Sequence, residues 1–300
     1  MDGLAAISIG IGPNLFDMGG LVLAWHGLFT FVAVALAVFL VAWWGSREGL
    51  SADAIYSVAV WAIIGGVIGA RLVYIIDVWD FYQNNLVKIL YVWQGGIAIY
   101  GAVLGGFAGG ALFIIIRNSA WFLALWGRYF RFLGQATRAP LPTVGRLADI
   151  AAPAMLLAQA IGRVGDIING EHCAGATSLP WGVIYTHPDS PGITLCGGGV
   201  THPAVAYELL MDLAILGFLW PLRRRLRPDG MFFALYLGTY SLGRFFLSFL
   251  RSEFKEYFLG LNEAQIIALI VMAVTIPLVV YKARLVQATT PRAARRRGRR

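Results

Sequence analysis

The chain has 300 residues, of which 58% are hydrophobic and only 13% are charged, and its mean hydropathy is +0.69. A soluble globular domain carries about 25% charged residues, so this composition excludes an ordinary soluble protein and indicates an integral membrane protein. The apolar stretches have helix length and show no spaced alternation, which predicts a helical bundle and not a transmembrane barrel. The net charge of +8 at pH 7 must then be explained by where the basic residues fall.

Seven apolar stretches have the length of a bilayer-spanning helix, about 17 to 25 residues. The first is not expected to be a cleavable signal peptide, because no basic residue precedes it and it is too long. The fourth is the shortest, and it becomes a full span only if Gly162–Ile168 continues it. We predict one polytopic domain over residues 1–283, with spans at Leu21–Trp44, Ala54–Val78, Ile97–Ile116, Leu147–Ile161, Ala204–Leu222, Met231–Leu250 and Ala264–Tyr281.

The basic residues alternate along the segments between these spans. Five arginines follow the third span, the C-terminal tail is strongly basic, and residues 164–203 contain no Lys or Arg. Because cytoplasmic loops collect Lys and Arg, this distribution predicts an N-terminus outside and a C-terminus inside. The expected fold class is an all-α seven-transmembrane helix bundle. Its tail, residues 284–300, is expected to be disordered and to lie on anionic membrane lipids, and no nucleic acid is expected as a partner.

The outward loop between spans four and five, Val164–Pro203, is too long for a simple connector, and ordered loops of this length tend to carry function. A strand-like run surrounds Trp181 and Tyr185. The two cysteines, Cys173 and Cys196, also fall in this loop, where they could pair on an oxidising face. Their spacing excludes a CxxC metal site, and the sequence leaves open whether they form a disulfide.

Two further segments are expected at the membrane surface. Trp121–Leu133 mixes aromatic residues and leucines with Arg128 and Arg131, which is typical of an interfacial amphipathic helix on the inner side. Asp17 and the apolar residues before the first span are interpreted as another short surface helix.

The densest group of polar residues follows directly on the fourth apolar stretch: Gly162-Arg163-Val164-Gly165-Asp166-Ile167-Ile168-Asn169-Gly170-Glu171. Ionisable groups at the end of a span are costly to desolvate and usually mark a functional site. The three glycines are interpreted as a tight turn that lets the backbone approach a ligand.

Three arginines remain inside the predicted spans: Arg71, Arg163 and Arg244. An arginine at the bilayer centre costs about 2.5 to 3.5 kcal/mol, so each is expected to face the protein interior. A structural interpretation pairs them with nearby carboxylates: Arg71 with Asp77, Arg163 with Glu171 or Asp166, and Arg244 with Glu208. The other interpretation is a basic cavity for a phosphate headgroup, because a guanidinium binds phosphate oxygens through two parallel N–H groups.

Small and polar residues elsewhere in the chain have both structural and functional interpretations. Glycines in the second and third spans favour close packing of membrane helices. His26, beside Trp25 near the outer end of the first span, could be structural or could act as a base near pH 7. Glu208, one turn inside the fifth span, is expected to pair with an arginine.

Together these motifs resemble those of the prolipoprotein diacylglyceryl transferase family. They occur in the family's order and span most of the chain, and the Gly162–Glu171 block is the most specific of them. The matching stretches are Trp25-His26-Gly27, Gly69-Ala70-Arg71, Gly95-Gly96 through Tyr100-Gly101 and Gly105-Gly106, Gly162 to Glu171, His202-Pro203 with Tyr207-Glu208, Gly243-Arg244, and Gln265.

The resemblance implies a multi-pass protein of the bacterial cytoplasmic membrane with seven spans and an active site toward the outer face. It implies transfer of an sn-1,2-diacylglyceryl group from phosphatidylglycerol to the lipobox cysteine of prolipoproteins, with release of glycerol 1-phosphate. This is the first step of lipoprotein maturation. The implied partners are phosphatidylglycerol, prolipoprotein signal peptides with a lipobox, and membrane lipids, and no metal or diffusible cofactor is implied.

The resemblance also implies roles for individual residues. Arg163 and Arg244 would bind or stabilise the phosphate. His26 or Tyr100 would accept the thiol proton, with Glu171 orienting the base or sharing its task. The phosphatidylglycerol site would be formed by Arg163, Asp166, Asn169, Arg71, Glu208 and Gly175.

The chain differs from the family pattern at several of these positions. His26 stands where many members have Tyr, and Asp166 where many have Asn. Ser248 stands where a Glu is common, and Tyr100 where some members carry His. These differences leave the base open between His26 and Tyr100. They also leave open a non-catalytic lipid-binding paralogue, while the intramembrane charges leave open a small-molecule transporter, although no inverted repeat is evident.

Overall fold

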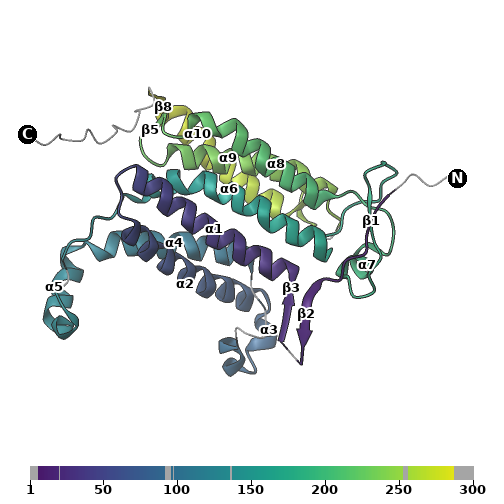
Figure 1. Ribbon diagram of the computed structural model, residues 1–300, viewed down its shortest axis with the longest axis horizontal. Coiled ribbons are helices and arrows are strands. Elements are labelled where there is room, and N and C mark those ends of the chain that lie inside the picture. The colour runs from purple at the N-terminus through teal and green to yellow at the C-terminus, as the bar shows by residue number, and fades with distance from the viewer. Residues whose placement is uncertain are drawn as a thin grey trace, which may run out of the picture. The chain divides into compact units, whose positions relative to one another are not determined.

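The computed structural model of the chain describes residues 6–19, 21–91, 96, 98–135, 137–252 and 256–286 (Figure 1). Within these residues, seven helices are long and apolar enough to cross a membrane, as predicted. Their ends lie within a few residues of the predicted spans, except in the fourth. They are α1 (Trp25–Arg47), α2 (Ala52–Asp77), α4 (Ile99–Arg117), α6 (Val144–Asn169), α8 (Ala204–Leu219), α9 (Met231–Leu247) and α10 (Glu263–Lys282).

Helix α6 changes the interpretation of the fourth span. It is continuous over 26 residues and contains Pro153, so the Gly162–Ile168 segment does continue the span. The expectation that all three glycines of the block make a tight turn is wrong, because Gly162 and Gly165 are helical. Only Gly170, with a φ of +73°, has the left-handed conformation that ends the helix. The polar residues of the block therefore lie at helical spacing.

The chain forms two compact units, and their boundaries fall inside α1 and α6. The first unit contains Met1–Leu40 and Ala148–Arg300, and the second contains Val41–Leu147. In the first unit, α9 packs against α10 and α8 (Figure 1). A hydrophobic cluster fixes this packing, with Ala152, Leu156, Leu219, Phe232 and Tyr236 all buried.

In the second unit, α2 packs directly on α4. The contact depends on glycine, since a Cβ added at Gly69 would lie 2.3 Å from the carbonyl oxygen of Gly101. A Cβ at Gly65 would lie 2.4 Å from the oxygen of Gly105. The predicted close packing of these spans is confirmed. The unit also contains α3 (Trp79–Tyr82), α5 (Ala120–Tyr129) and the short helices η1 (Leu86–Leu90) and η3 (Arg131–Leu133).

Short strands occupy the N-terminal segment and the loop after α6. A hairpin of β2 (Asn14–Met18) and β3 (Leu21–Ala24) stands where a surface helix was predicted, so that expectation is wrong. Gly19, with a φ of +59°, lies in the turn between the strands, where a β-hairpin favours glycine. β1 (Ile7–Ile9) pairs in parallel with β4 (Val183–Tyr185), which confirms the strand-like run around Tyr185.

The remaining elements are short. They are α7 (Pro191–Cys196), η4 (Trp220–Leu222), η5 (Ser248–Leu250), β5 (Leu226–Arg227), β6 (Glu256–Phe258), β7 (Leu261–Asn262) and β8 (Arg284–Leu285). β5 pairs with β8 and β6 with β7, each in the antiparallel sense. The first residues of the expected disordered tail therefore form a strand. Residues 287–300, Lys255 and Gln94-Gly95 lie outside the described residues.

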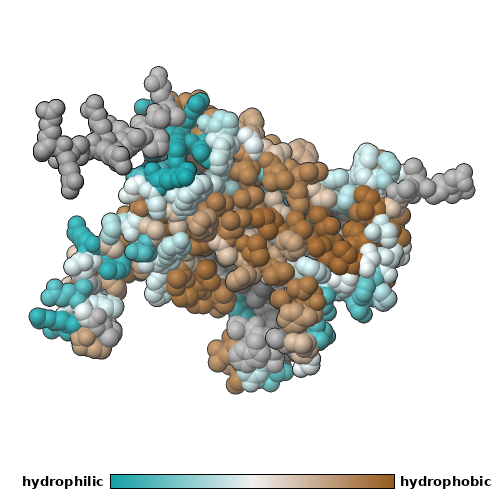
Figure 2. Space-filling model, viewed as in Figure 1, coloured by the Kyte–Doolittle hydropathy of each residue, from teal (hydrophilic) through white to brown (hydrophobic). Residues whose placement is uncertain are grey.

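Large hydrophobic side chains remain exposed along the spanning helices of both units. Phe31 on α1 is 72% exposed, Leu104 on α4 is 69% exposed, and Val280 on α10 is 70% exposed. Figure 2 shows hydrophobic residues gathered over the helical surfaces, with hydrophilic residues toward the helix ends. Such exposure is unfavourable in water and expected in lipid, so the surface agrees with a membrane-embedded bundle.

Candidate active site

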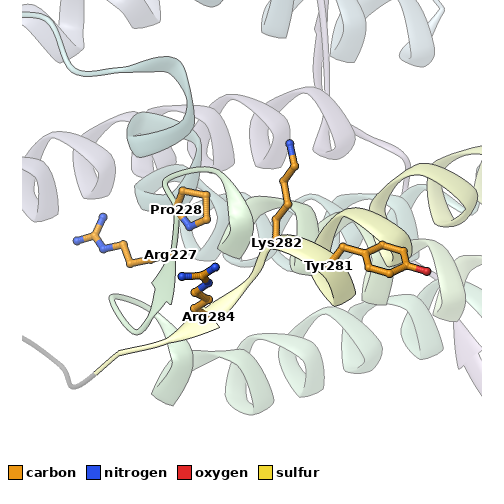
Figure 3. A pocket seen from close by; sticks show the side chains of 5 residues that line it. All are labelled: Arg227, Pro228, Tyr281, Lys282 and Arg284. Atoms are coloured by element: carbon orange, nitrogen blue, oxygen red, sulfur yellow. The ribbon is translucent and has the colours of Figure 1, made fainter.

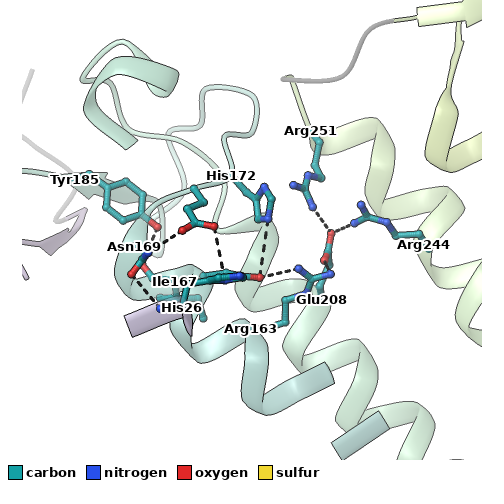
Figure 4. Close-up of polar contacts among 11 residues, drawn as sticks. His26, Arg163, Ile167, Asn169, His172, Tyr185, Glu208, Arg244 and Arg251 are labelled. Carbon is teal, nitrogen blue, oxygen red and sulfur yellow. Dashed lines mark hydrogen bonds and ion pairs between the residues drawn. The ribbon is translucent and has the colours of Figure 1, made fainter. Parts of the chain in front are cut away.

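The charged residues of the first unit meet at the C-terminal end of α6 (Figure 4). Arg163, Asp166 and Asn169 follow one another at intervals of three residues, which places them along one face of the helix. Nη1 of Arg163 lies 2.7 Å from Oδ2 of Asp166. Arg163 and Asp166 of the block singled out in the sequence therefore lie on a helix, and Glu171 follows the turn at Gly170.

Glu208 on α8 joins three arginines. Its Oε2 lies 2.7 Å from Nη2 of Arg163, and its Oε1 lies 2.9 Å from Nη1 of Arg251. Arg244 on α9 also forms an ion pair with Oε1. The side chain of Glu208 is 2% exposed, so burial strengthens each of these interactions and makes an unpaired charge there costly. The predicted pairs Arg244–Glu208 and Arg163–Asp166 are both present.

His26 approaches the same carboxylates from the first turn of α1. Its Nδ1 lies 2.5 Å from Oδ1 of Asp166 and 3.6 Å from Oε2 of Glu171. Its backbone N–H donates to Oδ1 of Asn169 at 3.3 Å, and so satisfies a donor that the start of a helix leaves unpaired. Nδ2 of Asn169 in turn donates to Oε1 of Glu171 at 2.7 Å.

Gly165 explains why α1 can come so close to α6. A Cβ at this position would lie 2.9 Å from Cα of His26 and 3.1 Å from the carbonyl oxygen of Trp25. A side chain would therefore separate the two helices at the point where His26 meets Asp166.

The loop after α6 is fixed to the end of that helix. A disulfide joins Cys173 to Cys196, with their Cα atoms 5.4 Å apart, and settles the question that the sequence left open. The Ser190 hydroxyl donates to the carbonyl oxygen of Asn169 at 3.1 Å. The Tyr185 hydroxyl donates to the carbonyl oxygen of Ile167 at 3.0 Å, and burial raises the pKa of Tyr185 to about 12. This tyrosine is therefore neutral at physiological pH and acts as a donor.

Gly175 and Ser248 also form hydrogen bonds in this region, Gly175 through its backbone and Ser248 through its side chain. The amide of Gly175 donates to the carbonyl oxygen of Leu250 at 2.8 Å, which ties the loop to η5, the short helix after α9. Ser248 is buried, and its hydroxyl donates to the carbonyl oxygen of Arg244 at 2.7 Å. The carboxylate that pairs with Arg244 comes from α8 and not from position 248.

Sequence reasoning missed three members of this region. Arg251 was not singled out in the sequence, yet its side chain is 1% exposed and bound to Glu208. Its position directly after the sixth span, on the predicted outer side, was the available signal. Nε2 of His172 lies 3.9 Å from Oδ2 of Asp166. Asp212, one turn beyond Glu208 on α8, is 1% exposed, and its Oδ1 has no hydrogen-bond partner within the described residues.

Arg71 and Tyr100 belong to the second unit. The buried Arg71 guanidinium donates to the carbonyl oxygens of Lys88, Ile89 and Gly96 at 2.8 to 2.9 Å. These bonds fasten the segment between α2 and α4 to α2. The predicted roles of Arg71 in lipid binding and of Tyr100 as a base stay predictions.

The His26, Asp166 and Glu171 side chains place one possible metal-ligand atom each within 4.8 Å of one another. Two ligands of one tetrahedral zinc, each about 2.0 to 2.2 Å from the ion, lie well over 3 Å apart. The 2.5 Å between His26 Nδ1 and Asp166 Oδ1 is shorter than that and corresponds to a hydrogen bond between the two side chains. The donor set therefore describes a bonded pair and not a metal cage.

A pocket of about 390 Å³ lies beside the C-terminal end of α10 (Figure 3). Its lining is basic and contains no carboxylate, and the side chains of Arg227, Tyr281 and Arg284 are largely exposed. The pocket therefore has no buried ion pair of the kind that Glu208 forms.

Seven apolar helices define a multi-pass membrane protein, and its first unit contains a buried network of arginines and carboxylates. The sequence profile described as prolipoprotein diacylglyceryl transferase matches residues 13–137 and 136–281. The chain belongs to this family.

Individual relatives agree with the profile. The phosphatidylglycerol–prolipoprotein diacylglyceryl transferase of Dehalococcoides mccartyi is 34% identical over 281 residues, which cover 92% of this chain and 95% of the relative. The protein of that name from Acaryochloris marina is 31% identical, covering 86% of each chain. The one from Synechococcus elongatus is 33% identical, covering 87% of this chain and 84% of its own.

Proposed function

We propose that the protein transfers an sn-1,2-diacylglyceryl group from phosphatidylglycerol to the lipobox cysteine thiol of prolipoproteins and releases glycerol 1-phosphate. This is the reaction that the names of its relatives describe and the first step of bacterial lipoprotein maturation. The proposal requires a site that holds a lipid phosphate next to a position where a thiol can be deprotonated.

The observation that carries the proposal is the group of three arginines around Glu208. Arg163, Arg244 and Arg251 bring three positive charges against the two carboxylates that they contact, Asp166 and Glu208. A guanidinium carries five N–H donors, so the bonds of Arg163 to these two carboxylates do not exhaust it. A group of guanidinium side chains of this kind suits the negative charge of a phosphodiester.

The reaction is an alkyl transfer. The acceptor thiol has a pKa of about 8.5 and attacks as a thiolate, so its proton must first be removed. Sulfur bonds to the glyceryl carbon that bears the phosphate ester, and the carbon–oxygen bond breaks with its electron pair going to oxygen. The leaving group is a phosphate monoester with greater negative charge than the diester. Arg163 and Arg244, held in place before the reaction, stabilise that developing charge.

Other residues of the cluster would shape the headgroup site. Asn169 and Glu171 are bonded to each other and lie beside the start of α1, where the positive end of the helix favours anions and hydroxyl groups. Gly175, whose amide bonds to the carbonyl oxygen of Leu250, would hold the loop in place on that side of the site. The predicted role of Arg71 in binding phosphatidylglycerol is part of this proposal.

We further propose that the protein lies in the bacterial cytoplasmic membrane with its site toward the outer face. The absence of Lys and Arg from residues 164–203 supports this orientation. The disulfide between Cys173 and Cys196 supports it too, because disulfides persist on the oxidising side of such membranes. The same loop carries Glu171, so the disulfide and the site share one end of the first unit.

The test is transfer of a diacylglyceryl group from phosphatidylglycerol vesicles to a lipobox peptide, detected by mass spectrometry of the peptide. Arg163→Ala and Arg244→Ala should each lower kcat/KM about 10²-fold or more, as removal of a donor to a developing oxyanion does. Arg225→Ala removes an exposed arginine outside the cluster and should leave the rate unchanged. Near-normal turnover in both cluster variants would contradict the assignment of the phosphate site. If the wild-type protein forms no adduct, the proposed function itself is wrong.

A further inference from the structure

The side chains of His26 and Asp166 form a 2.5 Å hydrogen bond that joins the start of α1 to α6. The side chain of Asp166 is 5% exposed, whereas that of His26 is 44% exposed. A buried carboxylate thus holds an imidazole that is itself partly exposed.

The bonds of Asp166 fix which nitrogen of His26 carries the proton. An ionised carboxylate only accepts hydrogen bonds, and its Oδ2 already accepts one from Nη1 of Arg163 at 2.7 Å. Oδ1 therefore requires a donor, which places the proton on Nδ1 of His26. Nε2 then carries a lone pair, and no contact of Nε2 occurs among the described residues. An amide at position 166 would instead turn its NH₂ group toward Nδ1 and reverse the tautomer.

We propose that His26 is the base that removes the acceptor thiol proton through Nε2, and that Asp166 is the positioning residue that holds it in this tautomer. This assignment rests on the proposed function and decides between the two bases that the sequence leaves open. The arrangement is the one by which an oriented base activates a nucleophile.

The proton and electron balance is complete without a further reactant. Nε2 takes the proton of the thiol, sulfur bonds to the glyceryl carbon, and the electron pair of the broken carbon–oxygen bond leaves on the phosphate. The imidazolium then returns its proton to solvent or to the phosphate monoester. Asp166 and Glu171, at 2.5 and 3.6 Å from Nδ1, stabilise the positive charge on His26 while it lasts.

The dyad is joined to the phosphate site by a continuous series of contacts. Asp166 bonds to His26 through Oδ1 and to Arg163 through Oδ2, and Arg163 continues to Glu208. The thiol would therefore be deprotonated at one end of a network whose other end binds the departing phosphate. Figure 4 shows this path from His26 to Arg244 and Arg251.

The experiment compares two acceptor peptides that differ in one atom. A lipobox peptide with selenocysteine in place of cysteine carries a group that is already ionised at neutral pH, so it needs no base. Full-length protein in phosphatidylglycerol nanodiscs is assayed with both peptides for kcat and for KM. The variants are His26→Gln and Asp166→Asn, and His187→Gln is the matched control, a histidine in the loop after α6 outside the cluster.

We expect His26→Gln to lower kcat for the cysteine peptide about 10²- to 10⁴-fold, the usual contribution of a general base, while the selenocysteine peptide keeps a rate near that of wild type. Asp166→Asn should likewise lower the cysteine rate relative to the selenocysteine rate, because the change alters the tautomer of His26. His187→Gln should change neither rate. Retained selenocysteine transfer also shows that the variant is folded and still binds the lipid.

Three outcomes would overturn the dyad while leaving the function intact. One is full cysteine transfer by His26→Gln; another is equal loss for both peptides, which indicates a structural role. A third concerns the double variant His26→Gln/Asp166→Asn. We expect it to lose no more cysteine activity than His26→Gln alone, because Asp166 acts through His26. If the two losses simply multiply, the residues do not act as a pair. A wild-type protein that modifies neither peptide overturns the proposed function itself.

Discussion

At the scale of single residues, Glu208 determines how the arginines of the site are held. Its two oxygens contact Arg163, Arg244 and Arg251, which come from three different segments of the chain. Without this carboxylate, three guanidinium groups would lose a buried carboxylate that they share. Glu208 therefore has a structural role within the proposed phosphate site.

Glu208→Gln should destabilise the protein by about 3 to 5 kcal/mol, the cost of breaking a buried ion pair from one side. Thermal unfolding in detergent measures this loss. Added phosphatidylglycerol should recover part of it, because a phosphate can replace the missing carboxylate among the arginines, whereas zwitterionic phosphatidylcholine should not. Glu263→Gln, at an exposed acidic residue in the first turn of α10, is the control and should unfold like wild type. Unfolding of Glu208→Gln at the wild-type temperature would contradict the role of Glu208.

Much of the site was predictable at this scale. Arg163, Asp166, Asn169 and Glu171 stand out because charge at the end of an apolar span is rare and costly. Arg251 was not predicted, although it directly follows the sixth span on the predicted outer side, where the positive-inside rule does not call for basic residues. Its burial in the structure places it with the charged cluster.

At the scale of secondary structure, α6 and the start of α1 together position the side chains of the site. The glycine-rich block continues α6 to Asn169, so its side chains are set by helical geometry. Gly165 lets the first turn of α1 approach, and the N–H of His26 then meets Asn169. The two neighbouring glycines of this helix have different surroundings, because a Cβ at Gly162 would meet nothing within 4 Å.

Gly165→Ala should therefore lower the transfer rate about 10²-fold, the cost of moving a catalytic group by about 1 Å, because its methyl group would push His26 away from Asp166. Gly162→Ala is the matched control on the same helix. It should keep its activity and gain about 0.5 to 1 kcal/mol in stability, since alanine is the better helix former. Rates for the purified variants, with their unfolding temperatures, test both statements. Equal rates for the two variants would show that helix approach at Gly165 does not matter.

The secondary-structure predictions failed where local sequence and long-range pairing disagree. The segment around Asp17 was interpreted as a helix but pairs with residues Leu21–Ala24 as a hairpin. The fourth span was predicted too short because the hydropathy of the chain falls at Arg163 and Asp166, although the helix does not end there. Hydropathy records the environment of side chains, and here the interior of the protein, not lipid, surrounds them.

At the scale of the whole molecule, the described chain consists of two units with different packing. The second depends on glycines that bring α2 and α4 backbones together, whereas the first packs larger side chains and encloses the charged network. Hydrophobic residues cover the helical surface of each (Figure 2). The disulfide and the loop after α6 lie at the charged end of the first unit, and the basic pocket at its other end.

The different chemistry of the two ends of the first unit predicts which end faces the outside of the membrane. Both cysteines of the chain are in the disulfide, so a single introduced cysteine is the only free thiol. In intact bacterial spheroplasts, a membrane-impermeant maleimide should label Asp189→Cys, which is exposed in the loop after α6. It should label Arg225→Cys, exposed after α8, only once the membrane is permeabilised. The reverse pattern would invert the proposed orientation and place the site on the inner face.

The sequence by itself determined that the chain crosses a membrane seven times and that charged residues near Gly162–Glu171 mark its site, because hydropathy and the cost of buried charge are local properties. Only the tertiary structure decided that Glu208 joins three arginines, that Cys173 and Cys196 pair, and that His26 meets Asp166. These contacts join residues 23 to 140 positions apart. Their partners are chosen by how helices pack, which no local pattern of residues records.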